Sequence, residues 1–208
     1  SIQPLNSSHD EARRFELLLR LMDRDGQIIA PNRFLPSVER YGLASRVDRW
    51  VVEAALRQVA NGMRGKQRAY FCINLSGQTL SDETFHDFVH EQIAASGVDP
   101  ASLCFEITET AAVSDLASAV GFMEKLQRIG CQFALDDFGS GLASFAYLKM
   151  LPVESLKIDG SLVRDIAQDE TEKAIVRAIH DMSRALGKVT VAECVENEAT
   201  LAVLREIG

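Results

Sequence analysis

The residues with the clearest chemical potential are two adjacent carboxylates, Asp136 and Asp137, which follow an apolar run at 131–135. The run indicates a buried parallel strand, and a flexible Gly-Ser-Gly turn at 139–141 follows the acidic pair. Neighbouring carboxylates repel one another, and burying them is unfavourable unless a cation lies between them. The pair therefore predicts a metal site, although on its own an Asp-Asp in a surface turn is the simpler alternative.

Other apolar, strand-like segments carry a polar side chain within or just after them. They are Glu16 and Arg20 at 15–21, Asn74 at 70–75, Glu106 at 103–107, Lys157 at 155–158, and Glu193 after 189–192. In a barrel both faces of a strand are covered, so solvent is not readily available to such side chains. We expect them to converge at the end of the barrel where the strands finish.

The predicted ligands are carboxylates and one amide, which are hard oxygen donors suited to Mg²⁺ or Mn²⁺. A carboxylate shared by two cations about 3.5–4 Å apart would suit in-line displacement at phosphorus. Local alternatives stay open for single residues. Asn74 could cap a turn, Lys157 could pair with Asp136, and Arg20 could pair with Glu16. Glu196 could lie in the first turn of the last helix, where a negative charge suits the dipole.

Composition restricts the class of protein. The 208 residues are 47% hydrophobic and 25% charged, with a net charge of −8, as in a globular domain. The acidic balance argues against a nucleic-acid polymer as partner, and no segment approaches the roughly 20 apolar residues of a membrane span. Cys72, Cys104, Cys131 and Cys194 lie in or beside apolar runs without a CxxC pair. They indicate buried thiols and a cytoplasmic location.

The strand candidates alternate with amphipathic helical stretches, and a weaker strand candidate lies at 1–5. The helices are expected at 47–59, 85–93, 116–129, 171–186 and 199–207. Repeated strand–helix units of roughly 30 residues indicate an α/β fold with a parallel sheet and right-handed crossovers. Six or seven units favour a (β/α) barrel. A doubly wound sheet is the alternative, but no GxGxxG follows the first strand.

Taken in order, the motifs resemble those of the EAL-domain phosphodiesterases, which hydrolyse cyclic di-GMP. They occupy residues 16–20, 73–76, 105–109, 136–141, 156–159 and 192–196. The resemblance implies a modified TIM (β/α)8 barrel with an antiparallel first strand, formed by residues 1–208 as a single domain. It also implies that this chain is a piece of a longer protein. The chain would lack the last strand of the barrel, because the family's final strand would follow Gly208.

The resemblance further implies a role for each matching residue. Cations would be bound by Glu16, Asn74, Glu106, Asp136, Asp137 and Glu193. The catalytic residues would be Lys157, which holds the attacking water, Glu193 as a base, and Asp137. Substrate would contact Gln3, Leu18, Arg20 and Glu196. Glu109 would anchor the loop that follows Asp137.

The implied reaction is hydrolysis of cyclic di-GMP to linear pGpG with two Mg²⁺ or Mn²⁺ ions. The implied partners are cyclic di-GMP, a second copy in a homodimer, and sensory or GGDEF-type domains in the full-length chain. The sequence departs from the motifs at Leu17, at Leu142-Ala143 and at Cys194. A receptor module that binds cyclic di-GMP without cleaving it is an alternative, as in degenerate relatives that have lost metal ligands, although no such loss is seen here. An unrelated divalent-metal barrel such as an enolase-like lyase is another, but it gives no reason for the adjacent Asp pair.

Overall fold

The computed structural model describes residues 1–5, 13–62, 69–141 and 145–208. The departure at Leu142-Ala143 lies outside the described residues. The chain divides into two compact units, one formed by Ser1–Glu106 with Gly121–Gln132 and the other by Ile107–Val120 with Phe133–Gly208.

The first unit begins with the antiparallel strand pair that the family resemblance implies. β1 (Ile2–Leu5) runs antiparallel to β2 (Arg13–Leu17), which is parallel to β5 (Ala69–Asn74), and β5 is parallel to β6 (Leu103–Thr108). The strand expected at 15–21 therefore starts earlier and ends at Leu17, where its ladders with β1 and β5 end. Arg20 lies beyond the strand rather than in it.

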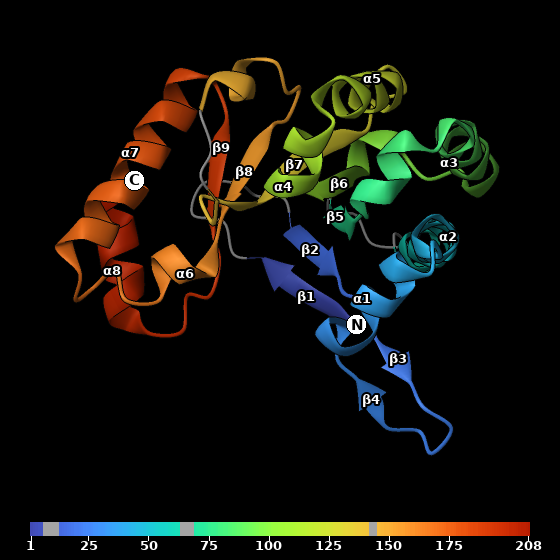
Figure 1. Cartoon of the computed structure of the whole chain (residues 1–208), viewed down its shortest axis with the longest axis horizontal. Helices are drawn as coiled ribbons and strands as arrows, with labels where there is room; N and C mark the ends of the chain where they lie inside the picture. The colour runs from blue at the N-terminus through green and yellow to red at the C-terminus, as the bar shows by residue number, and fades with distance from the viewer. Residues whose placement is uncertain (6–12, 63–68, 142–144) are drawn as a thin grey trace. The chain divides into compact units, whose positions relative to one another are not determined.

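Helices and short 3-10 turns complete the first unit (Figure 1). They are α1 (Pro31–Arg40), α2 (Ala44–Gly62), η1 (Gly77–Ser81), α3 (Glu83–Ser96) and η2 (Pro100–Ser102). Asp82 caps α3 by accepting the Thr84 N–H at 3.0 Å, a role that aspartate favours at a helix N-terminus. The core includes Val59, Phe85 and Val89, each fully buried.

A small hairpin and α1 are missing from the sequence prediction. β3 (Leu21–Met22) pairs with β4 (Ile28–Ile29), and the Asp23 side chain accepts the N–H groups of two turn residues. Strands of two residues are too short for a hydrophobic period to be read from sequence. α1 turns Phe34, Leu35 and Val38 to one partly covered face but buries no residue fully. It also contains Pro36, which interrupts the helical sequence pattern.

The second unit carries the parallel strands β7 (Gln132–Phe138), β8 (Ser155–Ile158) and β9 (Val189–Ala192). Its helices are α4 (Glu109–Ser114), α6 (Gly160–Val163), α7 (Glu170–Ala185) and α8 (Glu198–Ile207), with η3 (Phe145–Lys149) between β7 and β8. α5 (Leu116–Gln127) contributes residues to both units. All of β8 is buried, which matches an apolar run covered on both faces.

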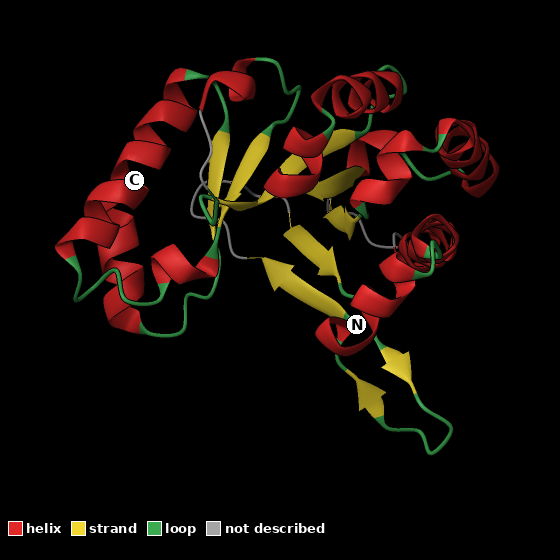
Figure 2. Cartoon of the chain, in the orientation of Figure 1, coloured by secondary structure: helices red, strands yellow, loops and turns green. Residues whose placement is uncertain are grey.

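Among the described residues, seven strands follow the order β1-β2-β5-β6-β7-β8-β9 in a mixed sheet. From β5 onward strands (yellow in Figure 2) alternate with helices (red) along the chain. The α/β class and the antiparallel first strand are confirmed. All four cysteines are free thiols, three of them buried and Cys194 half-buried. In the part of the chain that the structure describes, no helix has the length and hydrophobicity needed to cross a membrane.

Candidate functional site

Three carboxylates of the second unit gather at the C-terminal end of its strands. Asp136 and Asp137 come from the end of β7, and Glu193 directly follows β9. One carboxylate oxygen from each lies within 4.8 Å of the other two. Asp136 is 8% exposed, so the cluster combines burial with a concentration of negative charge, as in a site for a hard divalent cation.

Lys157 supplies a positive charge inside this cluster. It lies in β8 and is buried, with Nζ 3.1 Å from Oδ1 of Asp136 and 2.9 Å from Oε1 of Glu193. The pairing of Lys157 with Asp136 that sequence left open as an alternative is therefore present. One ammonium cannot neutralise three ionised carboxylates, so the cluster keeps a negative excess that suits a cation.

Asp137 occupies a strained position in the cluster. Its φ is +54°, where side-chain-bearing residues are uncommon, and β7 shifts register between Leu135 and Phe138. Desolvation raises the pKa of the Asp137 carboxyl, and the nearby charges of Asp136 and Asp159 raise it further, while Lys157 lowers it. A divalent cation would relieve this repulsion, so the donor set fits the metal that the sequence predicts.

The predicted ligands of the first unit lie on adjacent strands. Glu16 lies in β2, Asn74 ends β5, and Glu106 lies opposite Asn74 in β6. Asn74 Nδ2 donates to Oε1 of Glu16 at 3.0 Å, and Glu106 is 1% exposed. The turn after β5 is capped by Ser76, whose hydroxyl accepts the Gln78 N–H, so Asn74 does not serve as that cap. Glu16, Asn74 and Glu106 lie on three neighbouring strands of the first unit, and Asn74 contacts Glu16.

A buried carboxylate holds the turn that follows Asn74, and sequence reasoning missed it. Asp48 of α2 accepts the Ser76 N–H at 2.9 Å and the Thr79 hydroxyl at 2.5 Å. Burial raises the pKa of Asp48 to about 6, against the lowering effect of these two hydrogen bonds. The only sequence signal is an aspartate among the apolar positions of a helix, and its partners are 28 and 31 residues away.

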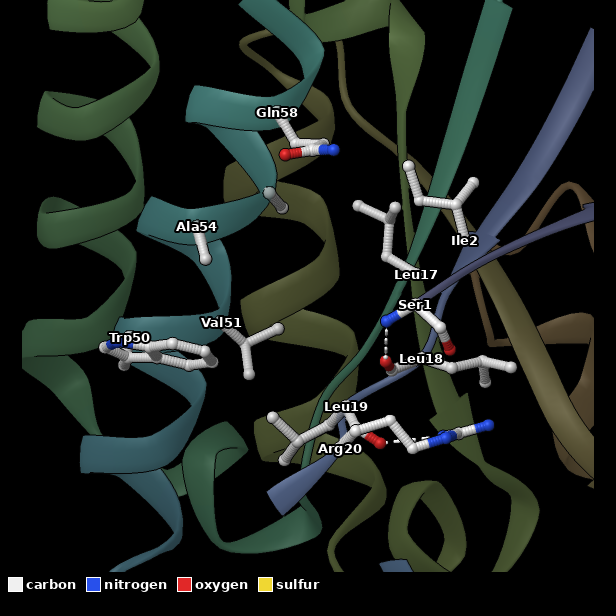
Figure 3. Close-up of a pocket in the computed structure, with 11 residues that line it drawn as sticks. Ser1, Ile2, Leu17, Leu18, Leu19, Arg20, Trp50, Val51, Ala54 and Gln58 are labelled. Atoms are coloured by element: carbon white, nitrogen blue, oxygen red, sulfur yellow. Dashed lines mark hydrogen bonds between the residues drawn. The ribbon is translucent and has the colours of Figure 1, made fainter. Parts of the chain in front are cut away.

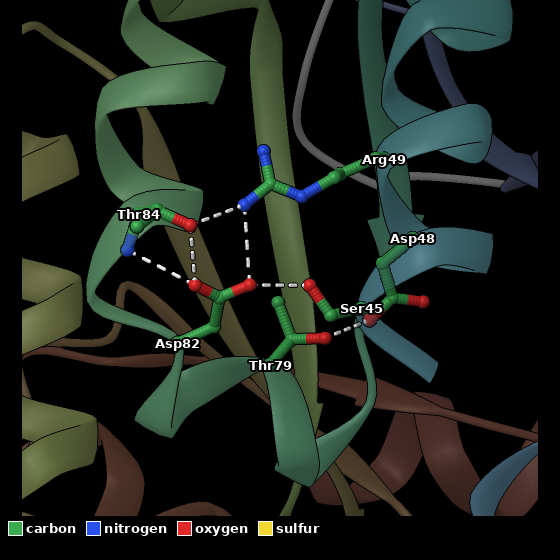
Figure 4. A network of polar contacts seen from close by, with 6 residues as sticks. All are labelled: Ser45, Asp48, Arg49, Thr79, Asp82 and Thr84. Atoms are coloured by element: carbon green, nitrogen blue, oxygen red, sulfur yellow. Dashed lines mark hydrogen bonds and ion pairs between the residues drawn. The ribbon is translucent and has the colours of Figure 1, made fainter. Parts of the chain in front are cut away.

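A second network ties α2 to α3 beside Asp48 (Figure 4). Asp82 accepts the Ser45 hydroxyl at 2.5 Å and Nη2 of Arg49 at 3.1 Å. The Arg49 guanidinium lies 4.7 Å from the centre of the Phe88 ring. These contacts hold the N-terminus of α3 against α2, and so support the turn between β5 and α3.

Two of the predicted substrate residues, Leu18 and Arg20, follow β2. They line a pocket of about 270 Å³ with Trp50, Val51 and Gln58 of α2. Figure 3 shows the Arg20 guanidinium pointing away from Trp50, and Nη1 donates to the Leu19 carbonyl at 2.7 Å.

The other two predicted substrate residues are Gln3, in the first unit, and Glu196, in the second. Gln3 is exposed in β1 and lies opposite Glu16 in the ladder with β2. Glu196 precedes Asn197, the N-cap of α8. The alternative that places Glu196 in the first turn of this helix is therefore wrong, because the helix starts after Asn197.

Glu109 contacts the loop that follows Asp137. It is 4% exposed at the start of α4, and its Oε2 accepts the Gly139 N–H at 2.9 Å. Its other oxygen accepts the hydroxyl of Tyr147, a contact absent from the sequence prediction. The predicted residues thus form two groups, with Glu16, Asn74 and Glu106 in the first unit and the Lys157 cluster and Glu109 in the second.

The sequence matches a known family along almost its whole length. A profile of the family described as "EAL domain" matches residues 2–208. The cyclic di-GMP phosphodiesterase PdeB of Shewanella oneidensis is 36% identical over 208 residues, 99% of this chain and 24% of that protein. The bifunctional diguanylate cyclase/cyclic di-GMP phosphodiesterase MucR of Pseudomonas aeruginosa is 34% identical, over 93% of this chain and 28% of its own length. The chain spans about a quarter of these relatives.

Solved structures share the fold. The FimX EAL domain from Pseudomonas aeruginosa bound to c-di-GMP has a TM-score of 0.93 and 30% identity, covering 100% of this chain and 84% of that one. The c-di-GMP complex of the PaMucR phosphodiesterase has a TM-score of 0.89 and 31% identity, covering 100% and 83%. The calcium and cyclic di-GMP complex of Klebsiella pneumoniae BlrP1 has a TM-score of 0.81 and 26% identity, covering 94% and 48%.

Proposed function

Because the chain belongs to the EAL domain family, we propose that it is a metal-dependent phosphodiesterase that hydrolyses cyclic di-GMP to linear pGpG. The observation that carries the proposal is the cluster of Asp136, Asp137 and Glu193 around the buried Lys157. Every position that the family uses for a ligand holds an oxygen donor. PdeB, at 36% identity, is named as a cyclic di-GMP phosphodiesterase.

The proposal assigns two cations to the ligand groups. Glu16, Asn74, Glu106 and Asp136 would hold one ion, and Asp136, Asp137 and Glu193 would hold the other. Two Mg²⁺ or Mn²⁺ ions would lower the pKa of a water and stabilise charge on the phosphoryl oxygens. The calcium in the BlrP1 complex supports a divalent cation in a related chain.

The side chains of the protein would orient the reactants. Lys157 would donate a hydrogen bond to the attacking water, and Glu193, within 2.9 Å of Lys157, would accept the proton of that water. The water oxygen forms a new bond to phosphorus, one P–O ester bond breaks, and the leaving oxygen takes up a proton. Arg20 would meet a substrate phosphate, and Gln3, Leu18 and Glu196 would contact the nucleotide.

The setting of the domain is part of the same proposal. Residues 1–208 would act as one EAL-type domain beside sensory or GGDEF-type domains, in keeping with the quarter of PdeB that the chain spans. The naming of MucR as bifunctional supports such an arrangement. We propose a homodimer in the cytoplasm, where cyclic di-GMP is the ligand.

Incubation of the purified chain with cyclic di-GMP and either Mg²⁺ or Mn²⁺ tests the proposal. We expect pGpG by chromatography, and no product in excess chelator. Absence of pGpG with both metals, while calorimetry shows that cyclic di-GMP is bound, would contradict catalysis.

The second candidate function is a receptor that binds cyclic di-GMP without cleaving it. The observation that favours it is Lys157, because its ammonium itself supplies positive charge to Asp136 and Glu193. A receptor would bind cyclic di-GMP equally well in chelator and in Mn²⁺, with no turnover in either. Calorimetry in chelator beside a product assay in Mn²⁺ separates the two functions.

A further inference from the structure

The carboxylate of Glu109 is bonded on both oxygens by groups from two different segments. Oε2 accepts the backbone N–H of Gly139 at 2.9 Å, and Oε1 accepts the hydroxyl of Tyr147 in η3. These partners are 30 and 38 residues from Glu109 in sequence. Glu109 is 4% exposed and Tyr147 is 8% exposed, so water competes little for either hydrogen bond.

The backbone held by this arrangement is the one that presents Asp137. Gly139 has a φ of +91°, two residues after Asp137 at +54°. The Ser140 hydroxyl donates to the Asp137 carbonyl at 2.9 Å. Side-chain-bearing residues at positive φ persist only where surrounding contacts hold them. The hydrogen bond from Gly139 to Glu109 is such a contact.

We propose that Tyr147 is a positioning residue for Asp137, acting through Glu109 and Gly139. The Tyr147 hydroxyl fixes the rotation of the Glu109 carboxylate, so that its second oxygen faces the Gly139 N–H. The inference rests on the proposed function, in which Asp137 is a cation ligand. Groups that orient a ligand from behind typically change metal affinity by about 10- to 100-fold when they are lost.

The hydroxyl of Tyr147 is suited to act as a permanent donor. Burial raises its pKa, and the hydrogen bond and charge of Glu109 raise it further. The phenol therefore keeps its proton throughout the working range of pH. A phenylalanine at 147 would leave the packing in place and remove only the donor.

Substitution Tyr147→Phe tests the inference, with Tyr41→Phe as the matched control, because Tyr41 is 74% exposed. Titration with Mn²⁺, followed by the spin-resonance signal of the free ion, measures affinity without any turnover. We expect about tenfold weaker Mn²⁺ binding for Tyr147→Phe, with a matching loss of turnover at low Mn²⁺ that is restored at high Mn²⁺. Binding of cyclic di-GMP in chelator should stay within twofold of wild type.

A double-mutant comparison in the Glu109→Ala variant tests whether Tyr147 acts through Glu109. In a Glu109→Ala chain, adding Tyr147→Phe should change Mn²⁺ affinity by less than twofold. Equal Mn²⁺ affinity of Tyr147→Phe and wild type, even with a lowered melting temperature, overturns the inference alone. Failure of wild type to bind Mn²⁺ overturns the proposed function together with it. If Glu109→Ala does not fold, the comparison of Tyr147→Phe with Tyr41→Phe still decides.

Discussion

At the scale of single residues, the site is set by charges that burial forces together. Asp136 and Lys157 are both largely hidden from solvent, at 8% and 2% exposure, and their ion pair at 3.1 Å compensates part of the desolvation of each. Desolvation raises the pKa of Asp137, and the charges of Asp136 and Asp159 raise it further, while Lys157 offsets part of this. The sequence predicted these residue types at the strand ends, because apolar runs ending in carboxylates are visible in one dimension.

Contacts between residues far apart in the chain could not be predicted from the sequence. Tyr147 contacts Glu109 across 38 positions, and nothing in the local pattern distinguishes it from an ordinary core tyrosine. In the sequence, Asp48 likewise looks like a single polar residue on a helix. Only the folded structure shows that Ser76 and Thr79 donate hydrogen bonds to it. Such positioning groups depend on tertiary structure, whereas the ligands depend mainly on the strand pattern.

Gly139 is a position where an added methyl group should be costly. Its φ is +91°, and a Cβ there would lie 2.7 Å from Cδ1 of Leu162. We expect Gly139→Ala to lower the free energy of unfolding by about 1–3 kcal/mol and to reduce turnover, because the strain falls beside Asp137. Urea unfolding followed by circular dichroism measures the first effect, and a pGpG assay measures the second.

Gly141 is the matched control for this substitution. It lies in the same turn and its φ is outside the left-handed range, and an added Cβ would meet no atom of the described residues within 4 Å. Gly141→Ala should leave stability within about 0.5 kcal/mol. Equal free energies of unfolding for the two variants would mean that neither the positive φ at Gly139 nor the approach to Leu162 makes an added methyl group unfavourable.

At the scale of elements, strands with apolar runs were predicted well, and short or proline-containing elements were not. Residue types favoured at helix ends do stand there, since Asp82 caps α3 and Gly187, at φ +69°, follows the C-cap of α7. β7 was expected to end before the acidic pair, but its assigned range reaches Phe138 and takes in both aspartates. A register shift between Leu135 and Phe138 allows this, and single-residue irregularities of that kind leave no periodic signal in sequence.

The turn between β5 and η1 should make stability depend on pH through Asp48. Burial raises its pKa in the folded state to about 6, against an ordinary value of 3.8 for an aspartate, so between these values the folded state holds a proton that the unfolded state has lost. Stability from this group therefore falls as pH rises from about 4 to about 6, by an amount on the order of 3 kcal/mol, and stays low above that range. Asp48→Asn should remove this slope.

Chemical unfolding at pH 4, 5, 6 and 7 measures the slope, with Asp25→Asn as a control because Asp25 is exposed in the β3–β4 turn. The control should keep the pH dependence of wild type. An Asp48→Asn chain with the same loss of stability between pH 4 and pH 6 as wild type would show that another group is responsible.

At the scale of the whole molecule, the chain is an acidic member of the EAL domain family, and its proposed metal ligands are spread over strands far apart in sequence. Its net charge is −8, and the motifs that carry ligands run from Glu16 to Glu193. Binding a cation to ligands so widely separated in the chain requires the folded state, so metal affinity and stability are coupled.

We therefore expect Mn²⁺ to raise the free energy of unfolding of the purified chain. At a free concentration 100 times the dissociation constant, the gain should be about 2.7 kcal/mol, and chelator should reverse it. Thermal melts with Mn²⁺, with chelator and with potassium chloride at equal ionic strength measure the effect. Equal midpoints in Mn²⁺ and in chelator would argue against a metal site formed by folding.

The central claim is that Asp136 holds cations which make this chain hydrolyse cyclic di-GMP. Asp136→Asn keeps the size of the side chain and removes its charge. The measurement is the rate of pGpG formation in saturating Mn²⁺ for wild type and Asp136→Asn, each with cyclic di-GMP bound. We predict that the variant loses at least about 10³-fold, or about 4 kcal/mol of transition-state stabilisation. An Asp136→Asn rate within tenfold of wild type would contradict the account.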